Sequence, residues 1–153
     1  MFILKVRLSP WLISAWQYSF HVHLILSLSC NIFKEYYYCC THLSLHEEDR
    51  ITSAAIIIDE LSKLDKPAII AGDFNALPNS FPMMALGRKF HIFEKMGSPY
   101  TFPANEPTRE IDYIALYTGG GASAEVVSHE VLHAPVESDH APIVAEVVIS
   151  QQK

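Results

Sequence analysis

Cysteine is scarce in this sequence: there are only three, Cys30, Cys39 and Cys40, and none forms a Cys-x-x-Cys pair. This count and spacing argue against a disulfide framework and against a zinc site. Basic runs are also missing, since 11 Lys and Arg stand against 17 Asp and Glu and the net charge is -6. Proteins that grip nucleic acid through its phosphates usually show a basic face. The composition therefore disfavours a tight, nonspecific nucleic-acid binder, and either clustered metal-binding carboxylates or plain surface solubility explains the acidic excess.

Residues 1–34 lack the regular patterning of the rest of the chain. Lys5 and Arg7 precede Pro10 and an apolar, aromatic stretch that ends near Cys30. This order resembles a secretory signal or a weak membrane anchor, although an uninterrupted run of about 18 apolar residues is absent. A mistaken translation start or retained intron, and a genuine strand-helix element, are the alternatives. We therefore expect 1–34 to be a segment apart, and the cellular location of the protein stays open.

From residue 35 onward the sequence alternates strand-like and helix-like patterns. An aromatic strand leads into Thr41-His42-Leu43, and Cys39 and Cys40 within it are interpreted as packing residues. Ser44 and Glu47 match a capping box that opens a helix over 47–64, and Pro67 ends it. A short helix is expected near 81–88, and further strands are expected at 68–71, 111–117, 123–132 and 142–149. This order predicts one mixed α/β unit over 35–150.

Two polar positions follow the strand at 68–71. Asp73 and Asn75 are two residues apart, so they face the same side in extended chain. Ligands of α/β proteins usually bind at the carboxyl ends of strands, although an Asx turn after a strand would give the same letters. Asp112 lies between the apolar Ile111 and Tyr113, and a carboxylate in such a strand is costly unless it has a partner. An edge strand that exposes Asp112 to water is the alternative.

Two further positions hold histidines beside strands. Asp139 and His140 precede Pro142 at the start of the last strand, where a proline removes no ladder donor. His42 lies between the aromatic strand and the capped helix. Taken singly, each has an ordinary alternative: a polar turn for the first pair, and a structural or solvated histidine for His42.

Taken together, these positions form an ordered set: Thr-His-Leu, Gly-Asp-Phe-Asn, Ile-Asp-Tyr-Ile and Ser-Asp-His-Ala-Pro. The set resembles the endonuclease/exonuclease/phosphatase superfamily over about residues 35–149. The resemblance implies a deoxyribonuclease-like four-layer α/β sandwich. Residues 35–150 would be the C-terminal half of that domain, supplying about one mixed sheet and its covering helix.

The resemblance also implies an Mg²⁺-dependent phosphoesterase, a hydrolase, with Mn²⁺ as an alternative ion. Asp73 would orient or deprotonate the attacking water, and Asn75 would hydrogen-bond that water or the scissile phosphate. His42 would help to protonate the leaving oxygen. Carboxylate oxygens are the ligands that Mg²⁺ prefers.

The same resemblance assigns His140, Asp112 and Asp139. His140 would contact the phosphate, and Asp112 would hold the ring of His140 in one tautomer and orientation. Asp139 would bind or approach the metal. Arg109, just ahead of Asp112, is a candidate phosphate contact, although solvated surface charge is its ordinary interpretation.

The sequence departs from the family pattern in its first part. The N-terminal asparagine and metal-binding glutamate of the family are not found, and Cys40 stands where an asparagine often precedes the Thr-His pair. A truncated, catalytically inactive remnant is therefore the alternative function. Tyr100-Thr101-Phe102-Pro103 looks like the small phosphodiesterase-type members. The substrate stays open among small molecules, lipid headgroups and nucleic acids, and no obligate protein partner is expected.

Overall fold

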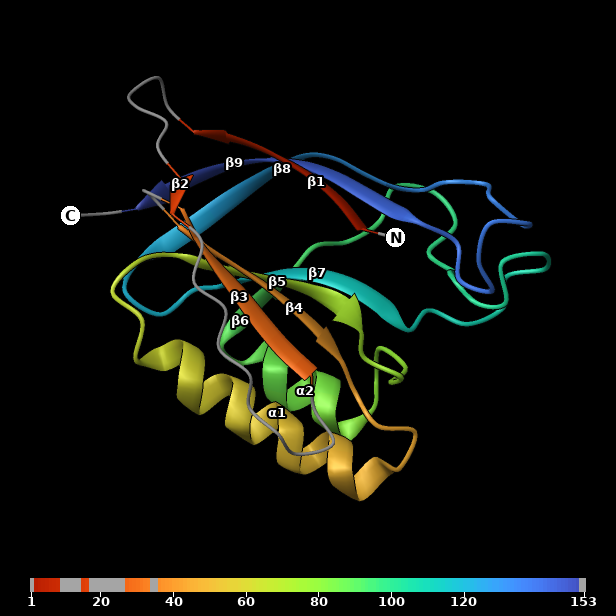
Figure 1. Cartoon of the computed structure of the whole chain (residues 1–153), viewed down its shortest axis with the longest axis horizontal. Coiled ribbons are helices and arrows are strands. Elements are labelled where there is room, and N and C mark those ends of the chain that lie inside the picture. Colours follow the sequence, from red (N-terminus) through yellow and green to blue (C-terminus); the bar gives the residue numbers. More distant parts are fainter. Residues whose placement is uncertain (1, 9–14, 17–26, 34–35, 152–153) are drawn as a thin grey trace.

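The structure of the protein is a computed structural model that describes residues 2–8, 15–16, 27–33 and 36–151. Figure 1 shows three layers, in which a large sheet lies between a smaller sheet and a pair of helices. The signal or anchor expected at the N-terminus falls largely on positions outside the described residues. Within the described ranges, neither helix has the length and apolarity needed to cross a membrane.

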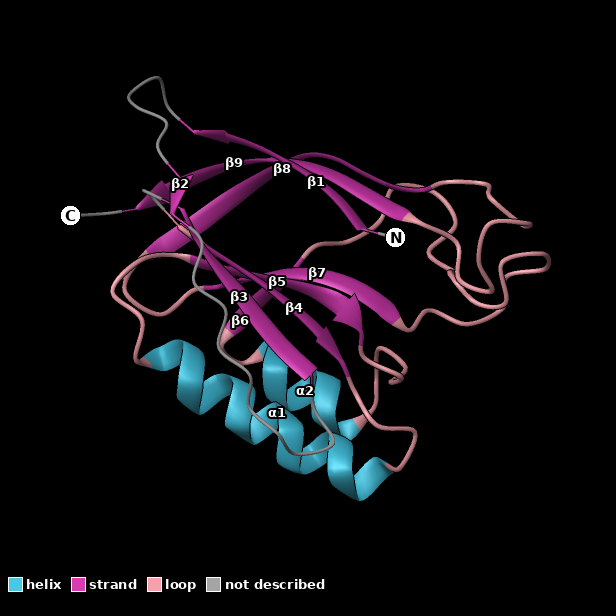
Figure 2. Cartoon of the chain, in the orientation of Figure 1, coloured by secondary structure: helices cyan, strands magenta, loops and turns pink. Residues whose placement is uncertain are grey.

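The larger sheet has six strands in the order β2-β3-β4-β5-β7-β6. β4 and β5 run parallel, and the other neighbours run antiparallel, so the sheet is mixed. The strands are β2 (Ala15–Trp16), β3 (Ser27–Phe33), β4 (Tyr37–His42), β5 (Ala68–Asp73), β6 (Phe90–Ile92) and β7 (Asp112–Tyr117). Helices α1 (Glu47–Ser62) and α2 (Phe81–Gly87) cover one face, as Figure 2 shows.

The smaller sheet has three strands in the order β1-β9-β8 and faces the opposite side of the larger sheet. Its strands are β1 (Phe2–Leu8), β8 (Ala122–Val131) and β9 (Ile143–Gln151). β1 pairs in parallel with β9, so the first and last strands of the chain are neighbours. β8 and β9 pair antiparallel, with a register irregularity between Val126 and Ser128.

The core has two parts because both faces of the larger sheet are covered. All six residues of β5 are buried, as expected for a strand with packing on both sides. Ile70 joins the cluster under the helices, with Leu61 of α1. Ile69 joins the cluster between the sheets, with Val147 of β9. Each fully buried side chain of this size contributes about 1.5–3 kcal/mol, so the strand is held firmly from both sides.

The predicted mixed α/β class is confirmed, and two local predictions were wrong. The capping box fails because α1 begins after His46, which makes no side-chain cap, and the Ser44 hydroxyl instead donates to the Asp49 carboxylate at 3.0 Å. Strand β6 lies within a stretch expected to be mostly loop. Cys39 is buried in the core, as its interpretation as a packing residue predicts, and it is also disulfide-bonded, whereas Cys40 is free.

One buried histidine makes the stability of the fold depend on pH. The His129 side chain is fully buried, and burial, helped by nearby Lys95, lowers its pKa to about 4. Its Nδ1 donates to the Phe93 carbonyl at 3.1 Å, while Nε2 has no hydrogen-bond partner. A second proton would therefore sit on an unpartnered, buried nitrogen.

We expect the free energy of unfolding to fall as the pH drops from about 6.5 toward 4. In this range His129 takes up a proton in the unfolded state but stays neutral in the folded state. The loss attributable to this residue is about 3 kcal/mol. Urea unfolding of the wild type and His129→Gln at pH 7 and pH 4.5 measures it. The variant should lose less stability than the wild type between the two pH values, and an equal loss would contradict the assignment.

Candidate active site

Three of the sequence-predicted residues align across three neighbouring strands. His42 ends β4 and pairs with Asp73 at the end of β5, and Asp73 pairs with Asp112 at the start of β7. β4 and β5 are parallel, so their carboxyl ends meet at one edge, and antiparallel β7 begins there. This edge is the right-hand side of the larger sheet in Figure 1, where the loops gather.

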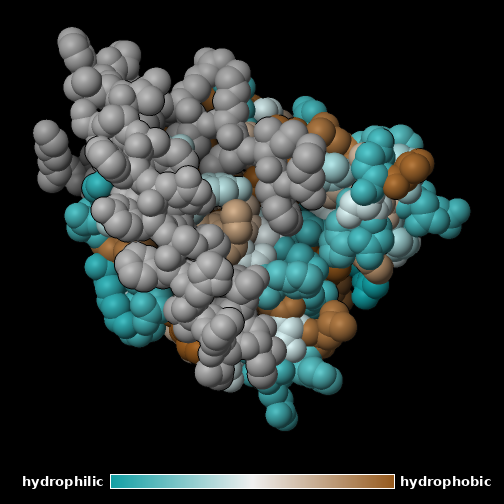
Figure 3. Space-filling model, viewed as in Figure 1, coloured by the Kyte–Doolittle hydropathy of each residue, from teal (hydrophilic) through white to brown (hydrophobic). Residues whose placement is uncertain are grey.

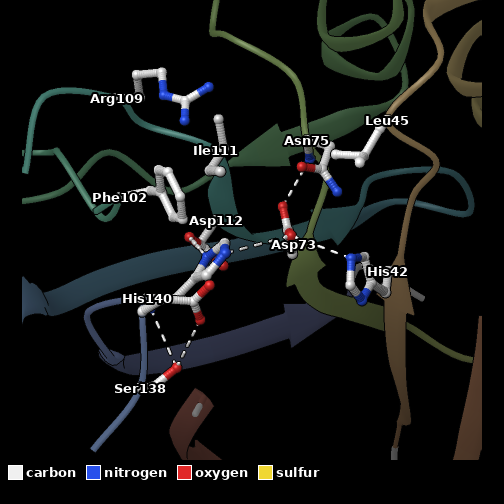
Figure 4. Close-up of a pocket in the computed structure, with 11 residues that line it drawn as sticks. His42, Leu45, Asp73, Asn75, Phe102, Arg109, Ile111, Asp112, Ser138 and His140 are labelled. Atoms are coloured by element: carbon white, nitrogen blue, oxygen red, sulfur yellow. Dashed lines mark hydrogen bonds and ion pairs between the residues drawn. The ribbon is translucent and has the colours of Figure 1, made fainter. Parts of the chain in front are cut away.

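These side chains open into a cavity of about 500 Å³. Its lining contains every site residue predicted from the sequence, together with four others. The predicted residues are His42, Asp73, Asn75, Arg109, Asp112, Asp139 and His140, and the additional ones are Leu45, Phe102, Ile111 and Ser138. Figure 4 shows ten of these eleven residues labelled as they surround the cavity. Figure 3 shows mainly hydrophilic surface over the loops at the right of the view.

A tight turn fixes Asp73 and Asn75 relative to each other. The Asn75 backbone N–H donates to Asp73 Oδ1 at 2.8 Å. Asn75 has a φ of 48°, a left-handed conformation that asparagine adopts more readily than most residues. Its Nδ2 donates to the Leu43 carbonyl at 2.8 Å. The turn is therefore the Asx turn considered as an alternative, but it also orients the amide beside the carboxylate at the cavity.

Asp73 lies between two histidines. Its Oδ2 is 3.3 Å from His42 Nε2 and 3.8 Å from His140 Nε2. Burial raises the pKa of Asp73, the Asn75 backbone N–H lowers it, and the charge of Asp112 raises it further. The two histidines oppose the shift in part. A carboxyl whose pKa moves upward in this way is a better proton acceptor than an ordinary aspartate.

Asp112 holds the ring of His140. The His140 Nδ1 and Asp112 Oδ2 atoms are 2.9 Å apart, and the Asp112 side chain is 3% exposed. An ionised carboxylate only accepts, so Nδ1 carries the hydrogen and Nε2 points toward Asp73. The partner that a buried carboxylate in a core strand requires is therefore His140. Phe102 packs against the same ring, with centroids 4.8 Å apart.

The segments that carry these groups are tied together by the backbone. Ala104 N–H donates to the Asp139 carbonyl at 2.8 Å, and Ala141 N–H donates to the Thr101 carbonyl at 2.7 Å. A buried ion pair of 2.6 Å between Lys95 and Glu110 holds the chain just before β7. Breaking such a pair is costly because one charge is left buried and unpaired. These contacts therefore fix the cavity wall at the points where His140 and Asp112 project.

Three donor atoms at the cavity could hold a metal ion. Asp73, Asp112 and His140 each offer one ligand atom, and these atoms lie within 4.8 Å of one another. Asp73 and Asp112 are nearly buried on paired strands, and the charge of Asp112 raises the pKa of Asp73. A cation between them would reduce this repulsion between the two carboxylates. Asp139, predicted as the metal ligand, lines the cavity but lies outside this group. Its role stays a prediction.

Sequence reasoning missed Phe102 as a site residue. It belongs to the Tyr-Thr-Phe-Pro stretch that carried part of the family resemblance, so a signal was present. The stretch alone could not reveal that its ring touches both His140 and Arg109, because these contacts join separate loops. Leu45, Ile111 and Ser138 are neighbours of predicted residues, and proximity in sequence was the only clue to them.

Known structures share this fold. A mannosyl-6-phosphatase of Bacteroides thetaiotaomicron matches with a TM-score of 0.66 and 21% identity, over 80% of this chain and 56% of that one. The human Nocturnin catalytic domain with bound sulfate matches with a TM-score of 0.63 and 21% identity, over 83% and 53%. TDP2 of D. rerio, complexed with a single-strand DNA product, matches with a TM-score of 0.61 and 15% identity, over 82% and 61%.

This chain thus spans a little over half the length of these solved structures. No curated protein sequence matches it. Residues 9–140 match the sequence pattern of one family, which is most of the chain. The chain belongs to the endonuclease/exonuclease/phosphatase family.

Proposed function

We propose that this chain hydrolyses a phosphate ester by attack of a water molecule that Asp73 activates. One observation carries the proposal: His42, Asp73 and Asp112 form one row across three strands, and His140 closes over that row. Membership of a family named for nucleases and phosphatases supports the reaction class. Among similar structures, one is a mannosyl-6-phosphatase and another holds a DNA product, so both sugar phosphates and nucleic acids are represented.

The geometry gives each residue a role in the reaction. Water gives a proton to Asp73 as its oxygen forms a bond to phosphorus, and the bond from phosphorus to the leaving oxygen breaks. Protonated His42, 3.3 Å from Asp73, gives its proton to that leaving oxygen. The proton held by Asp73 then returns to His42, which restores both groups. The Asn75 side-chain amide donates to the phosphate oxygens as negative charge develops. His140, oriented by Asp112, contacts the same phosphate through its Nε2 side.

We propose that Mg²⁺ is bound at the carboxylates of this cavity. When bound, it would neutralise negative charge on the phosphate. Asp73 and Asp112, with His140, form the group that the geometry brings together, and Asp139 is the ligand implied by the family resemblance. Oxygen donors suit Mg²⁺, which completes its shell with water.

Calorimetric titration of Mg²⁺ into the wild type, Asp139→Asn and Asp112→Asn tests this metal assignment without any turnover. We expect saturable binding in the wild type and at least tenfold weaker binding when a true ligand is replaced. Asp59→Asn, on the exposed face of α1, is the matched control and should bind as the wild type does. Weaker Mg²⁺ binding in Asp112→Asn alone places the ion among Asp73, Asp112 and His140. The absence of Mg²⁺ binding to the wild type contradicts the metal proposal.

A chromogenic assay tests the reaction class. The purified chain is incubated with bis(4-nitrophenyl) phosphate, a diester, and with 4-nitrophenyl phosphate, a monoester, in Mg²⁺ or in a chelator. Release of 4-nitrophenol that requires Mg²⁺ is the expected result. No release from either ester by the folded protein favours the second candidate, a catalytically inactive remnant.

A further inference from the structure

Arg109 is the only Lys or Arg among the described residues that line the active-site cavity. The same lining contains the carboxylates of Asp73, Asp112 and Asp139. Guanidinium stays protonated at every relevant pH, so Arg109 is the permanent positive charge that a phosphate ester meets on entering. Arg109 makes no ion pair with any carboxylate in the described part of the chain. The cation is therefore available to a ligand.

Backbone hydrogen bonds hold Arg109 in place. Arg109 and Phe102 form an isolated antiparallel bridge, in which each backbone N–H donates to the other's carbonyl at 2.9 and 3.1 Å. Thr101 N–H also donates to the Arg109 carbonyl, at 2.8 Å. The Arg109 guanidinium carbon lies 4.6 Å from the Phe102 ring centroid, a cation–π contact. Backbone and ring together hold this charge at the cavity wall.

Phe102 separates Arg109 from the groups that act on the scissile phosphate. Its ring packs on His140 at 4.8 Å as well as on Arg109. Figure 4 shows Phe102 between Arg109 and His140, with Asp73 and His42 on the other side of His140. Arg109 is thus one aromatic ring away from the catalytic row. Arg109, His140 and Asn75 line one cavity of about 500 Å³, so a phosphate held by His140 and Asn75 and a second anionic group beside Arg109 would share it.

We propose that Arg109, held by Phe102, is a second anion site that selects esters carrying another phosphate beside the scissile one. The proposal rests on the function proposed above and adds a substrate class to it. A planar guanidinium binds phosphate through paired hydrogen bonds, which a substrate with one phosphate cannot use at this position. Two sources share this chemistry, a nucleotide chain with successive phosphates and a small bisphosphate.

Matched substrates test the selection. The thymidine 5′-(4-nitrophenyl phosphate) ester is compared with the same ester that also carries a 3′-phosphate, so the leaving group is identical. We expect the wild type to prefer the second ester about ten- to one hundred-fold in kcat/KM. Arg109→Gln should bring this ratio close to one. Phe102→Leu should lower the ratio, whereas Phe102→Tyr, which keeps the ring, should retain it.

Arg88→Gln is the matched control, because Arg88 is exposed just after α2 and does not line the cavity. Its substrate ratio should equal that of the wild type. A wild-type ratio near one overturns the proposal. The proposal is also overturned if Arg109→Gln lowers kcat/KM equally for both esters and leaves the preference intact.

Calorimetric binding separates this proposal from the proposed reaction. Thymidine 3′,5′-bisphosphate should bind the wild type more tightly than thymidine 5′-phosphate, and Arg109→Gln should remove the difference. This result without turnover of any ester supports the anion site while the proposed reaction fails. Glucose 1,6-bisphosphate against glucose 6-phosphate is the second arm: a preference there as well indicates small bisphosphates, and a preference only in the thymidine pair indicates nucleotides. Equal binding within both pairs overturns the anion site.

Discussion

Replacing Asp73 by asparagine is expected to lower kcat/KM by about a thousandfold. Asparagine keeps an oxygen that accepts the Asn75 backbone N–H, so the turn at the end of β5 stays closed. What it loses is the negative charge beside His42 and the capacity to take a proton from water. The measurement is steady-state hydrolysis of the best ester, with unfolding monitored in parallel. A variant that keeps its rate would contradict the role of Asp73.

The matched comparison uses histidines. His140→Ala should lose activity to a similar extent, and His91→Ala, on the exposed side of β6 and outside the cavity, should keep it. Asp73 and His140 face each other across 3.8 Å and are proposed to act on one phosphate, so their losses should not add. The double variant should be little slower than the worse single variant. Fully multiplicative losses would indicate two independent sites.

The composition of this site was predictable from the sequence because its residues fall at strand ends. Asp73 was expected at the carboxyl end of a buried strand, and Asp112 was expected in an apolar strand that needs a polar partner. The structure supplies that partner in His140, 2.9 Å away. The family resemblance implied this pairing, whereas the residue pattern alone could not, because 28 residues separate the two positions. Register across β4, β5 and β7 decides which side chains meet, and register is a tertiary property.

Prediction of the fold succeeded where hydrophobic periodicity is strong, and it failed where local signals compete. The strand at 68–71 and the helix from residue 47 agree with the structure to within two residues at each end. The capping box failed because the Ser44 hydroxyl bonds to Asp49 and not to the helix backbone. β6 was missed because three residues are too few for a period to show, and its pairing with β7 is what makes it a strand. The expected boundary after residue 34 stays a prediction, while β1 pairs with β9 and β3 with β4.

Gly72 gives the clearest case of a motif residue whose physical reason emerges only in the structure. In the sequence, Gly72 opens the Gly-Asp-Phe-Asn motif at the end of the strand at 68–71. In the structure it is a residue of β5, paired with Thr41 of β4. A Cβ at this position would lie 1.9 Å from the Thr41 carbonyl oxygen and 2.8 Å from its carbon. The glycine is therefore required by the close approach of two backbones, one residue before the row that joins His42 to Asp73.

We expect Gly72→Ala to reduce the free energy of unfolding by about 4 kcal/mol or more, a loss reserved for severe packing defects. The clash is with backbone, so no side-chain rotation relieves it, and β4 must move away from β5. Gly87→Ala is the matched control, because its Cβ would meet only Ile92 Cδ1 at 3.8 Å, an ordinary contact. That control should shift stability by no more than about 1 kcal/mol. Urea unfolding of both variants measures the difference, and a Gly72→Ala protein as stable as the control would contradict the close approach. Moving β4 away from β5 also moves His42 away from Asp73. Any folded Gly72→Ala protein should therefore hydrolyse esters more slowly, whereas Gly87→Ala should not.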